Sequence, residues 1–239
     1  MLKRNPNNSR ILIISDLHAP YNHKDALPFL FALQKKYKFT RIISIGDEID
    51  NHSVSFHDSD PNLASPKHEL EAAKKVLAKL HKEFPVMDII SSNHGDLYER
   101  KLRHHGLPEN ILRSRNEIYG VGSGWKFHRE LVLDMPNGDE VLFHHGIEST
   151  AVNAAIHRGM SLVQGHYHTK FEIAYYRNSK TLGWGMTVGC LIDRESLAML
   201  YAREAKKMQL IGCGCIIDSQ PRLLPMKLNS KGRWTHDVP

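Results

Sequence analysis

Aspartate, asparagine and histidine residues follow five short apolar runs of this sequence. Each of these runs has the composition of a buried strand. The polar segments are Asp16-Leu17-His18, Gly46-Asp47-Glu48-Ile49-Asp50, Ser92-Asn93-His94-Gly95, His144-His145-Gly146 and Gly165-His166-Tyr167-His168. Because ligands of open α/β sheets bind at the carboxyl ends of the strands, these side chains are expected to converge. Lys and Arg are absent from these strand ends, so a metal ion is the simplest source of the missing positive charge.

Each segment also has a purely structural interpretation when it is taken alone. Asp-x-His after a strand arises often by chance, and Gly-Asp-x-x-Asp is also compatible with a turn and a helix cap. The pair His166 and His168 is more specific, because residues two apart in an extended segment point to the same side. Five such segments in this order favour one joint site.

In their order and spacing, the five segments resemble the motifs of the calcineurin-like metallophosphoesterases. Those motifs are D-x-H, G-D-x-x-D, G-N-H-[DE], H-G and G-H-x-H, and the resemblance covers roughly residues 11 to 170. Two positions depart from the pattern: Ser92 replaces the usual glycine and Gly95 the usual acidic residue. Neither position is a metal ligand in the family, so the resemblance implies an intact site.

The resemblance implies two divalent metal ions and direct attack of a bridging hydroxide on phosphorus, without a phospho-enzyme. One ion would take three ligands, the other three more, and one carboxylate would bridge both. These ligands are Asp16, His18 and His168 for the first ion, Asn93, His145 and His166 for the second, and Asp47 as the bridge. Such a mixed donor set suits Mn²⁺, Fe or Zn²⁺, with Mn²⁺ favoured. Asn93 is also expected to contact substrate.

Further roles are expected next to the ligands. His94 would be the general acid, or would stabilise charge at the leaving oxygen. Asp50 is expected to orient a ligand histidine. His144 is the alternative to His145, because alternation along the strand points the two rings to opposite faces. Glu48 is expected to point outward.

Two regions are candidates for substrate contacts. The loop 51–69 is long enough to be a binding element, with His52 and His57 facing the pocket, although a solvated insertion explains it equally well. Arg100 and Arg103 follow the third motif on a predicted helix, where they could contact a substrate phosphate. Exposed helix arginines are more often simply solvated.

Composition limits the class of protein. The 239 residues are 41% hydrophobic and 24% charged, as in ordinary globular proteins. No apolar stretch is long enough to cross a membrane, and the N-terminus lacks the apolar region of a signal peptide. A net charge of +6 and 16 histidines favour anionic partners. The three cysteines read as buried thiols in a reducing compartment, so we expect a cytoplasmic protein.

The elements that must position the motifs follow from hydrophobic patterns. Apolar runs at 11–15, 41–45 and 86–91 predict strands, and helical patterns lie between and after them. This alternation predicts a parallel sheet. In the second half, Asn137-Gly138 predicts a hairpin, followed by a helix at 150–158 and further short strands.

We therefore expect an α/β fold of two stacked mixed β-sheets flanked by helices. The chain is interpreted as one domain, 1–239, with a loose N-terminal arm at 1–10 and a loose tail at about 229–239.

The expected activity is hydrolysis of a phosphoester. A phosphomonoesterase acting on a nucleotide or another small phosphorylated substrate is preferred. A phosphodiesterase or DNA nuclease of the DNA-repair exonuclease type, with nucleic acid as its partner, is the alternative. A binding module that has lost catalysis is disfavoured by the intact ligand set. The exact substrate, the native metal and the oligomeric state stay open at this point.

Overall fold

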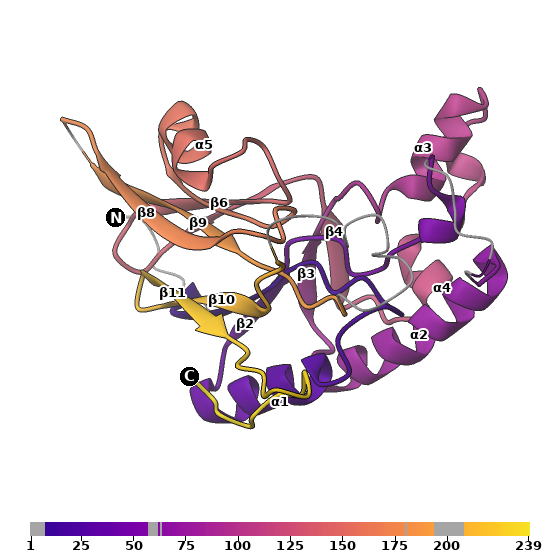
Figure 1. The fold of residues 1–239 in the computed structure, drawn as a ribbon. Helices are drawn as coiled ribbons and strands as arrows, with labels where there is room; N and C mark the ends of the chain where they lie inside the picture. Colours follow the sequence, from indigo (N-terminus) through magenta and orange to yellow (C-terminus); the bar gives the residue numbers. More distant parts are fainter. Residues whose placement is uncertain (1–7, 57–61, 63, 180, 194–207) are drawn as a thin grey trace.

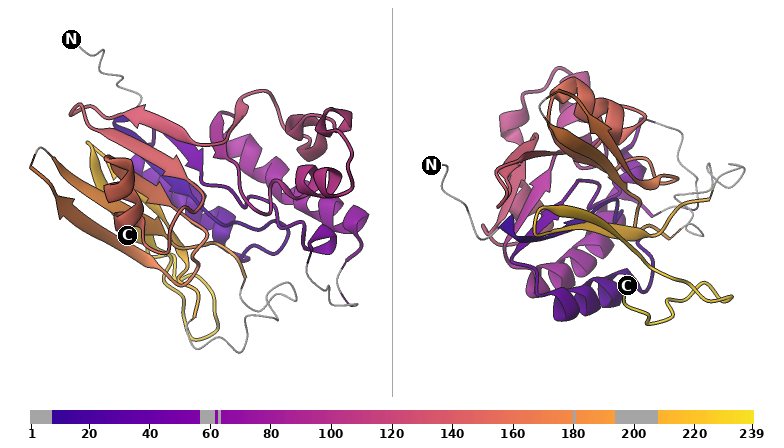
Figure 2. Two further views of the ribbon diagram at one scale, coloured as in Figure 1. Left: turned by 90° about the horizontal axis from the view of Figure 1, so that it is seen from above. Right: turned by 90° about the vertical axis from the view of Figure 1, so that its left-hand side faces the viewer.

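The computed structural model describes residues 8–56, 62, 64–179, 181–193 and 208–239. In this part of the chain, two β-sheets lie face to face and helices cover their outer faces (Figure 1). Two further views show helices α1 (Ala26–Tyr37) and α2 (Pro66–Glu83) on one side and α5 (Ala151–Arg158) on the other (Figure 2). The expected α/β fold of two stacked mixed sheets flanked by helices is confirmed.

The first sheet has the strand order β11-β10-β1-β2-β3-β4. These strands are β1 (Arg10–Ile14), β2 (Arg41–Ser44), β3 (Met87–Ile90), β4 (Trp125–His128), β10 (Gly212–Ile217) and β11 (Gln220–Pro225). Strands β1 to β4 run parallel to one another, and β10 and β11 are antiparallel additions beside β1. The alternating first half of the chain thus forms the parallel sheet that its pattern predicts.

The second sheet has the strand order β5-β6-β7-β9-β8. These strands are β5 (Leu131–Asp134), β6 (Glu140–His144), β7 (Ser161–Gln164), β8 (Phe171–Arg177) and β9 (Leu182–Val188). The predicted hairpin joins β5 to β6, and Gly138 in its turn has φ +93°, a conformation that glycine adopts without strain. Strands β6, β7 and β9 run parallel.

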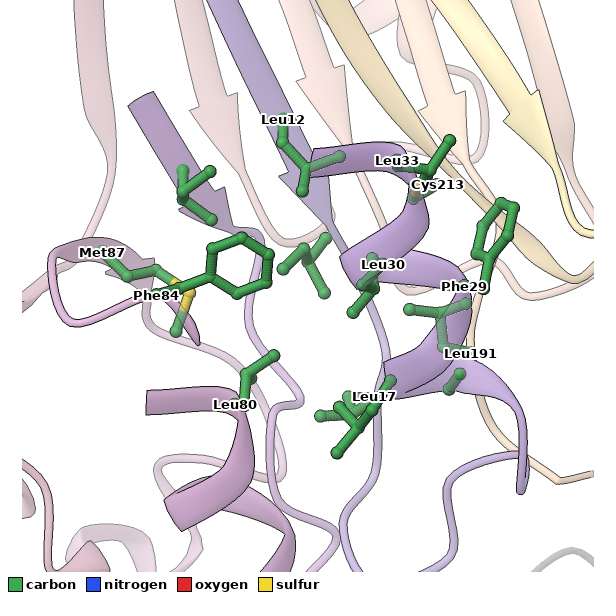
Figure 3. Close-up of a cluster of buried hydrophobic side chains, with 14 of the residues drawn as sticks. Leu12, Leu17, Phe29, Leu30, Leu33, Leu80, Phe84, Met87, Leu191 and Cys213 are labelled. Carbon is green, nitrogen blue, oxygen red and sulfur yellow. The ribbon is translucent and has the colours of Figure 1, made fainter. Parts of the chain in front are cut away.

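Strand β1 is buried on both faces, as its continuous apolar run predicts. Leu12 and Ile14 belong to the core cluster under α1 and α2, while Ile11 and Ile13 belong to the cluster between the two sheets. Figure 3 shows the first cluster, in which Leu30 of α1 lies among side chains of the sheet and of α2. This two-sided burial fixes the position of the loop that follows β1.

Short helices complete the part of the molecule around the motif loops. They are η2 (His52–Val54), α3 (Leu97–His104), η3 (Glu109–Ile111) and α4 (Arg115–Tyr119). The start of α2 is the one that the sequence predicts, because the Ser65 side chain accepts a hydrogen bond from the His68 N–H and Pro66 occupies the first turn. Among the described helices, none combines the length and apolar composition needed to span a membrane.

The C-terminal segment differs from the expectation of a loose tail. Trp234 is buried, and its ring meets that of Phe29 at a centroid distance of 5.5 Å. Arg233 pairs with Asp25 at 2.5 Å, and this hydrogen bond lowers the pKa of the Asp25 carboxyl. The prediction was wrong because these partners lie beside α1, about 200 residues earlier in the chain, and no local pattern reveals them. Of the expected N-terminal arm, residues 1–7 lie outside the described residues, and Asn8 donates to the Asp134 carbonyl.

Candidate metal centre and adjoining cavity

The five predicted segments converge at one end of the two sheets. They follow β1, β2 and β3 in the first sheet and β6 and β7 in the second, and within each sheet these strands are parallel. Parallel strands have their carboxyl ends at the same edge, which explains the convergence. Three groups of side chains place metal-binding atoms within 4.8 Å of one another. They are Asp16 with His18 and His168, Asp47 with His145 and His166, and His18 with Asp50 and His94.

Asp47 lies between the two sets of predicted ligands. Its Oδ2 atom is 3.6 Å from His18 Nε2 and 3.2 Å from His145 Nε2. One carboxylate oxygen therefore faces an imidazole from each set. This is the bridging position that the resemblance implies.

The remaining predicted ligands lie beside these two histidines. On the His18 side, His168 Nε2 is 3.0 Å from Asp16 Oδ1. On the other side, Asn93 Oδ1 is 2.8 Å from His145 Nε2. The structure thus places each ligand in the half of the site to which the resemblance assigns it.

The protonation of the rings tests whether this donor set fits metal ions. His18 Nδ1 lies 2.6 Å from Asp50 Oδ1, and His145 Nδ1 lies 2.7 Å from the Ile45 carbonyl oxygen. Both partners are acceptors, so each Nδ1 carries a proton and each Nε2 is the atom that faces Asp47. A proton on Nε2 or a metal ion can occupy the space between each Nε2 and the carboxylate, and a metal ion would take the Nε2 lone pair of the neutral ring. The residues present therefore fit divalent ions.

The charge balance of the buried side chains points the same way. Burial opposes a charged His145, but the neighbouring Asp47 carboxylate outweighs it and raises the pKa of that imidazole to about 9. Burial would raise the pKa of Asp47, but His145 and His94 outweigh it and hold that pKa well below its usual range. The site is therefore arranged to keep its carboxylate ionised in the interior.

Four predicted ligands have left-handed backbone conformations. The φ angles are +50° at Asp16, +51° at His18, +48° at Asp47 and +66° at His166. Such conformations cost of order 1–3 kcal/mol each at non-glycine residues and cluster at functional sites. The fold maintains this strain in order to direct these side chains into one space.

Steric constraints explain why the motif has glycine at position 46. Its φ is +81°, and a Cβ atom at this position would lie 2.5 Å from Ser92 Cβ. Ser92 stands where the family has glycine, and its hydroxyl accepts hydrogen bonds from the N–H groups of Asp47 and Gly95. The departure from the motif is thus compatible with the loop geometry.

His94 and Asp50 lie beside the ligands, as expected. His94 Nδ1 donates to the Asp50 carbonyl oxygen, and the His94 backbone N–H donates to Asp47 Oδ1 at 3.1 Å. The Nε2 atom of His94 is therefore left for other partners. Asp50 Oδ1 lies 2.6 Å from His18 Nδ1, a contact compatible with the predicted role of orienting a ligand histidine.

The two adjacent histidines of β6 point to different surroundings. His145 is buried within the ligand group, whereas His144 is half-buried and lines a cavity. The backbone N–H of Gly146 donates to His144 Nδ1 at 3.1 Å. Strand alternation thus separates the rings in the way the sequence predicts.

A cavity of about 420 Å³ borders the Asn93, His145 and His166 half of the site. Arg100 lines it, as expected of a substrate contact, and its Nη1 donates to the Asn93 carbonyl oxygen at 3.0 Å. Arg129 also lines the cavity, and the sequence analysis missed it. Arg129 directly follows β4, so predicting a fourth parallel strand would have placed this residue at the same sheet edge.

Two other predicted substrate contacts lie elsewhere. Arg103 pairs with Glu109 at 2.9 Å and is exposed, because it lies about 4.5 Å further along α3 than Arg100. The His52 ring is 3.9 Å from Asp50 Oδ2 and is outside the wall of the cavity, while His57 lies outside the described residues.

Glu48 contradicts the expectation that it points outward. It is buried, and its Oε1 accepts a hydrogen bond from the Tyr119 hydroxyl at 2.9 Å. Arg115 lies close enough to stabilise its charge, although burial still raises the pKa of Glu48. Strand β2 ends at Ser44, and Gly46 and Asp47 both have positive φ angles, so strand alternation does not set the direction of the next side chain, which turns toward Tyr119 of α4.

The sequence matches no family model and no curated protein. Solved structures that match include YfcE, a phosphoesterase from E. coli, at 11% identity and a TM-score of 0.48, covering 95% of this chain and 96% of that chain. Vps29 from Chaetomium thermophilum matches at 12% identity and a TM-score of 0.49, covering 98% and 96%. Vacuolar protein sorting 29 from Cryptosporidium parvum matches at 14% identity and a TM-score of 0.41, covering 90% and 94%.

At these identities and TM-scores, the case for function rests on the side chains of the site itself.

Proposed function

We propose that this chain is a dinuclear metal-dependent phosphoester hydrolase. The observation that carries the proposal is the position of Asp47 Oδ2, within 3.6 Å of imidazole nitrogens from both His18 and His145. Asp16, His18 and His168 would hold one ion, Asn93, His145 and His166 the other, and Asp47 both. When bound, two divalent ions, Mn²⁺ favoured, would activate water and stabilise negative charge at the phosphoryl oxygens.

His94 is the candidate general acid. Its Nδ1 donates to the Asp50 carbonyl oxygen, which orients the ring and leaves Nε2 to hold or release a proton. The side chain is 20% exposed, so it is accessible from the site. This geometry supports proton donation from His94 Nε2 to the leaving oxygen of the ester.

We prefer a phosphomonoesterase that acts on nucleotides or other small phosphate esters. The cavity of about 420 Å³ lies within the range of small-molecule sites and borders one half of the ligand set. Arg100 on its wall offers a cation to an anionic substrate.

One observation favours a phosphodiesterase or DNA nuclease as the second candidate. Arg100 and Lys101 of α3 lie over the Phe56 ring, with centroid distances of 5.4 and 4.1 Å. Basic side chains that alternate with an aromatic ring are typical of surfaces that bind single-stranded nucleic acid. This surface lies next to the cavity.

A cytoplasmic location is part of the proposal. Cys190, Cys213 and Cys215 are all free and buried, and burial raises the pKa of each thiol. Thiols that persist without pairing support a reducing compartment.

A metal-supplemented screen of phosphate esters tests the proposal. The chelator-treated protein should be inactive, and Mn²⁺, Fe²⁺ or Zn²⁺ should restore release of inorganic phosphate from mononucleotides with only modest salt dependence. Cleavage of DNA that falls steeply with salt, without phosphate release from mononucleotides, would favour the second candidate. Full activity with less than one ion per chain would contradict both.

A further inference from the structure

We infer that the cavity beside the candidate metal centre binds a second phosphate group of the substrate, through Arg100 and Arg129. The inference deepens the proposed function and rests on it, because the first phosphate would be the one that is hydrolysed. A substrate with two phosphates includes a nucleoside bisphosphate or diphosphate, and also two successive phosphates of a polynucleotide.

Arginines reach the cavity from two separate elements. Arg100 belongs to α3, and Arg129 directly follows β4 at the edge of the first sheet. The opposite part of the lining includes His144, Gly146 and His166 from the second sheet. A group held in this space would therefore be contacted from both sheets.

Two carboxylates close to the cavity in the structure or in the sequence pair with other arginines. Asp96, which also lines the cavity, pairs with Arg115 at 2.6 Å. Glu130, adjacent to Arg129 in the sequence, pairs with Arg158 at 3.2 Å. Neither carboxylate forms an ion pair with Arg100 or Arg129, although Arg115 is shared between Asp96 and Glu99.

The two guanidinium groups keep unused donors. Within the described ranges, Arg129 makes no ion pair and no side-chain hydrogen bond, and Arg100 makes no ion pair. Arg100 uses one nitrogen, Nη1, on the Asn93 carbonyl oxygen. Its remaining N–H groups are available, and this hydrogen bond keeps it next to a predicted metal ligand.

His144 adds a neutral donor to the same wall. Its Nδ1 accepts from the Gly146 N–H, so the neutral ring carries its proton on Nε2. Two planar, permanently charged guanidinium groups and one N–H donor match a phosphate, which accepts several hydrogen bonds and pairs with arginine in a bidentate manner.

The experiment compares a one-phosphate with a two-phosphate compound. Adenosine 5′-monophosphate and adenosine 3′,5′-bisphosphate are titrated into chelator-treated protein by calorimetry, and kcat/KM for both is measured with Mn²⁺. Arg129→Ala and Arg100→Ala should each reduce the preference for the bisphosphate by about tenfold, the effect of one lost charge-assisted contact. Arg103→Ala is the matched control, because Arg103 lies on the same helix, pairs with Glu109 and lies outside the cavity wall.

The outcomes separate this inference from the proposed function. If no phosphoester is hydrolysed but binding of the bisphosphate depends on Arg129, the proposed function is wrong and the second-phosphate subsite stands. If hydrolysis occurs and the preference in Arg129→Ala and Arg100→Ala equals that in Arg103→Ala, the subsite is wrong.

A single-stranded DNA oligonucleotide then identifies the source of the second phosphate. Cleavage that requires Arg129 and weakens steeply with salt assigns the subsite to a polynucleotide. A dependence on Arg129 for the bisphosphate alone assigns it to a small molecule.

Discussion

Asp47 and Glu48 are adjacent in the sequence and equally buried, with 1% relative exposure each, yet their surroundings are opposite. Asp47 faces the Nε2 atoms of two histidines whose Nδ1 protons are used elsewhere. Glu48 faces the hydroxyl of Tyr119 and the guanidinium of Arg115. The pKa of Asp47 lies well below its usual range, where histidines outweigh burial, and burial raises that of Glu48.

The difference shows how a buried carboxylate reveals its role. Glu48 Oε1 accepts from the Tyr119 hydroxyl, the Arg115 guanidinium opposes the effect of burial on its pKa, and it faces none of the predicted ligand histidines. Asp47 faces two Nε2 atoms that either carry a proton or offer a lone pair, so its charge can be balanced by imidazolium groups or by metal ions held on those nitrogens. Both side chains are carboxylates and are equally buried. Their neighbours are what distinguish the candidate metal ligand from the carboxylate that packs against α4.

The largest effect is expected for Asp47→Asn, because this side chain faces both halves of the site. Losing several kcal/mol of charge stabilisation corresponds to a fall in kcat/KM on the order of 10³-fold. Glu48→Gln is the matched control, since it makes the same chemical change at a neighbouring buried carboxylate. Elemental analysis and hydrolysis assays measure both variants. If both variants lose the same amount of activity and metal, the distinction between Asp47 and Glu48 is wrong.

His94→Ala should come next, with an effect that depends on the leaving group. Loss of a general acid typically costs about 10²–10⁴-fold, and the loss should be greatest for alkyl phosphates and smaller for activated aryl phosphates. The metal content should stay at the wild-type value. His105→Ala, at the exposed end of α3, serves as the control. Loss of bound metal in His94→Ala would show that His94 is not the acid. An equal loss of activity on alkyl and aryl phosphates would show the same.

Asp50→Asn is expected to weaken only the Asp16, His18 and His168 half of the site. Removing a partner that orients a ligand histidine costs about 10–100-fold in metal affinity. Competition with a chelator should therefore show that the protein binds one ion more weakly and the other with unchanged affinity. An equal loss of affinity for both ions would show that Asp50 supports the whole loop and not His18 in particular.

Tyr119→Phe should have the smallest effect and should change stability alone. The substitution removes the hydroxyl that donates to Glu48 Oε1, and the loss of a buried hydrogen bond to a carboxyl group costs about 1–3 kcal/mol. Denaturant unfolding measures the cost, while metal content and kcat should equal those of the wild type. Loss of metal in this variant would mean that the contact between Glu48 and Tyr119 also supports the loop that carries Asp47.

Much of the site follows from local patterns. His145 is separated from His144 by strand alternation. His166 and His168 both reach the site after β7, but in different ligand groups, and His166 has a left-handed backbone (φ +66°) in place of the expected extended one. The parallel order of the first strands explains why residues so far apart in the chain share one edge. For these residues, the period of the strand and the place where it ends carry the information.

The unpredicted features all depend on contacts between distant segments. Arg129 reaches the cavity because β4 joins the sheet beside β3, and Trp234 is buried because it meets Phe29. Arg103 has the residue type expected of a phosphate contact, but its place on α3 gives it Glu109 as a partner.

The sequence by itself determined which side chains form the candidate centre, because apolar runs of strand length end at each of them and parallel strands end at one edge. It also determined the α/β class, through the alternation of the two periodicities. Only the tertiary structure decided which buried carboxylate faces two histidines and which arginines line the cavity. Those properties depend on the atoms that distant segments bring within a few ångströms, and electrostatic interactions of buried groups are set at that distance.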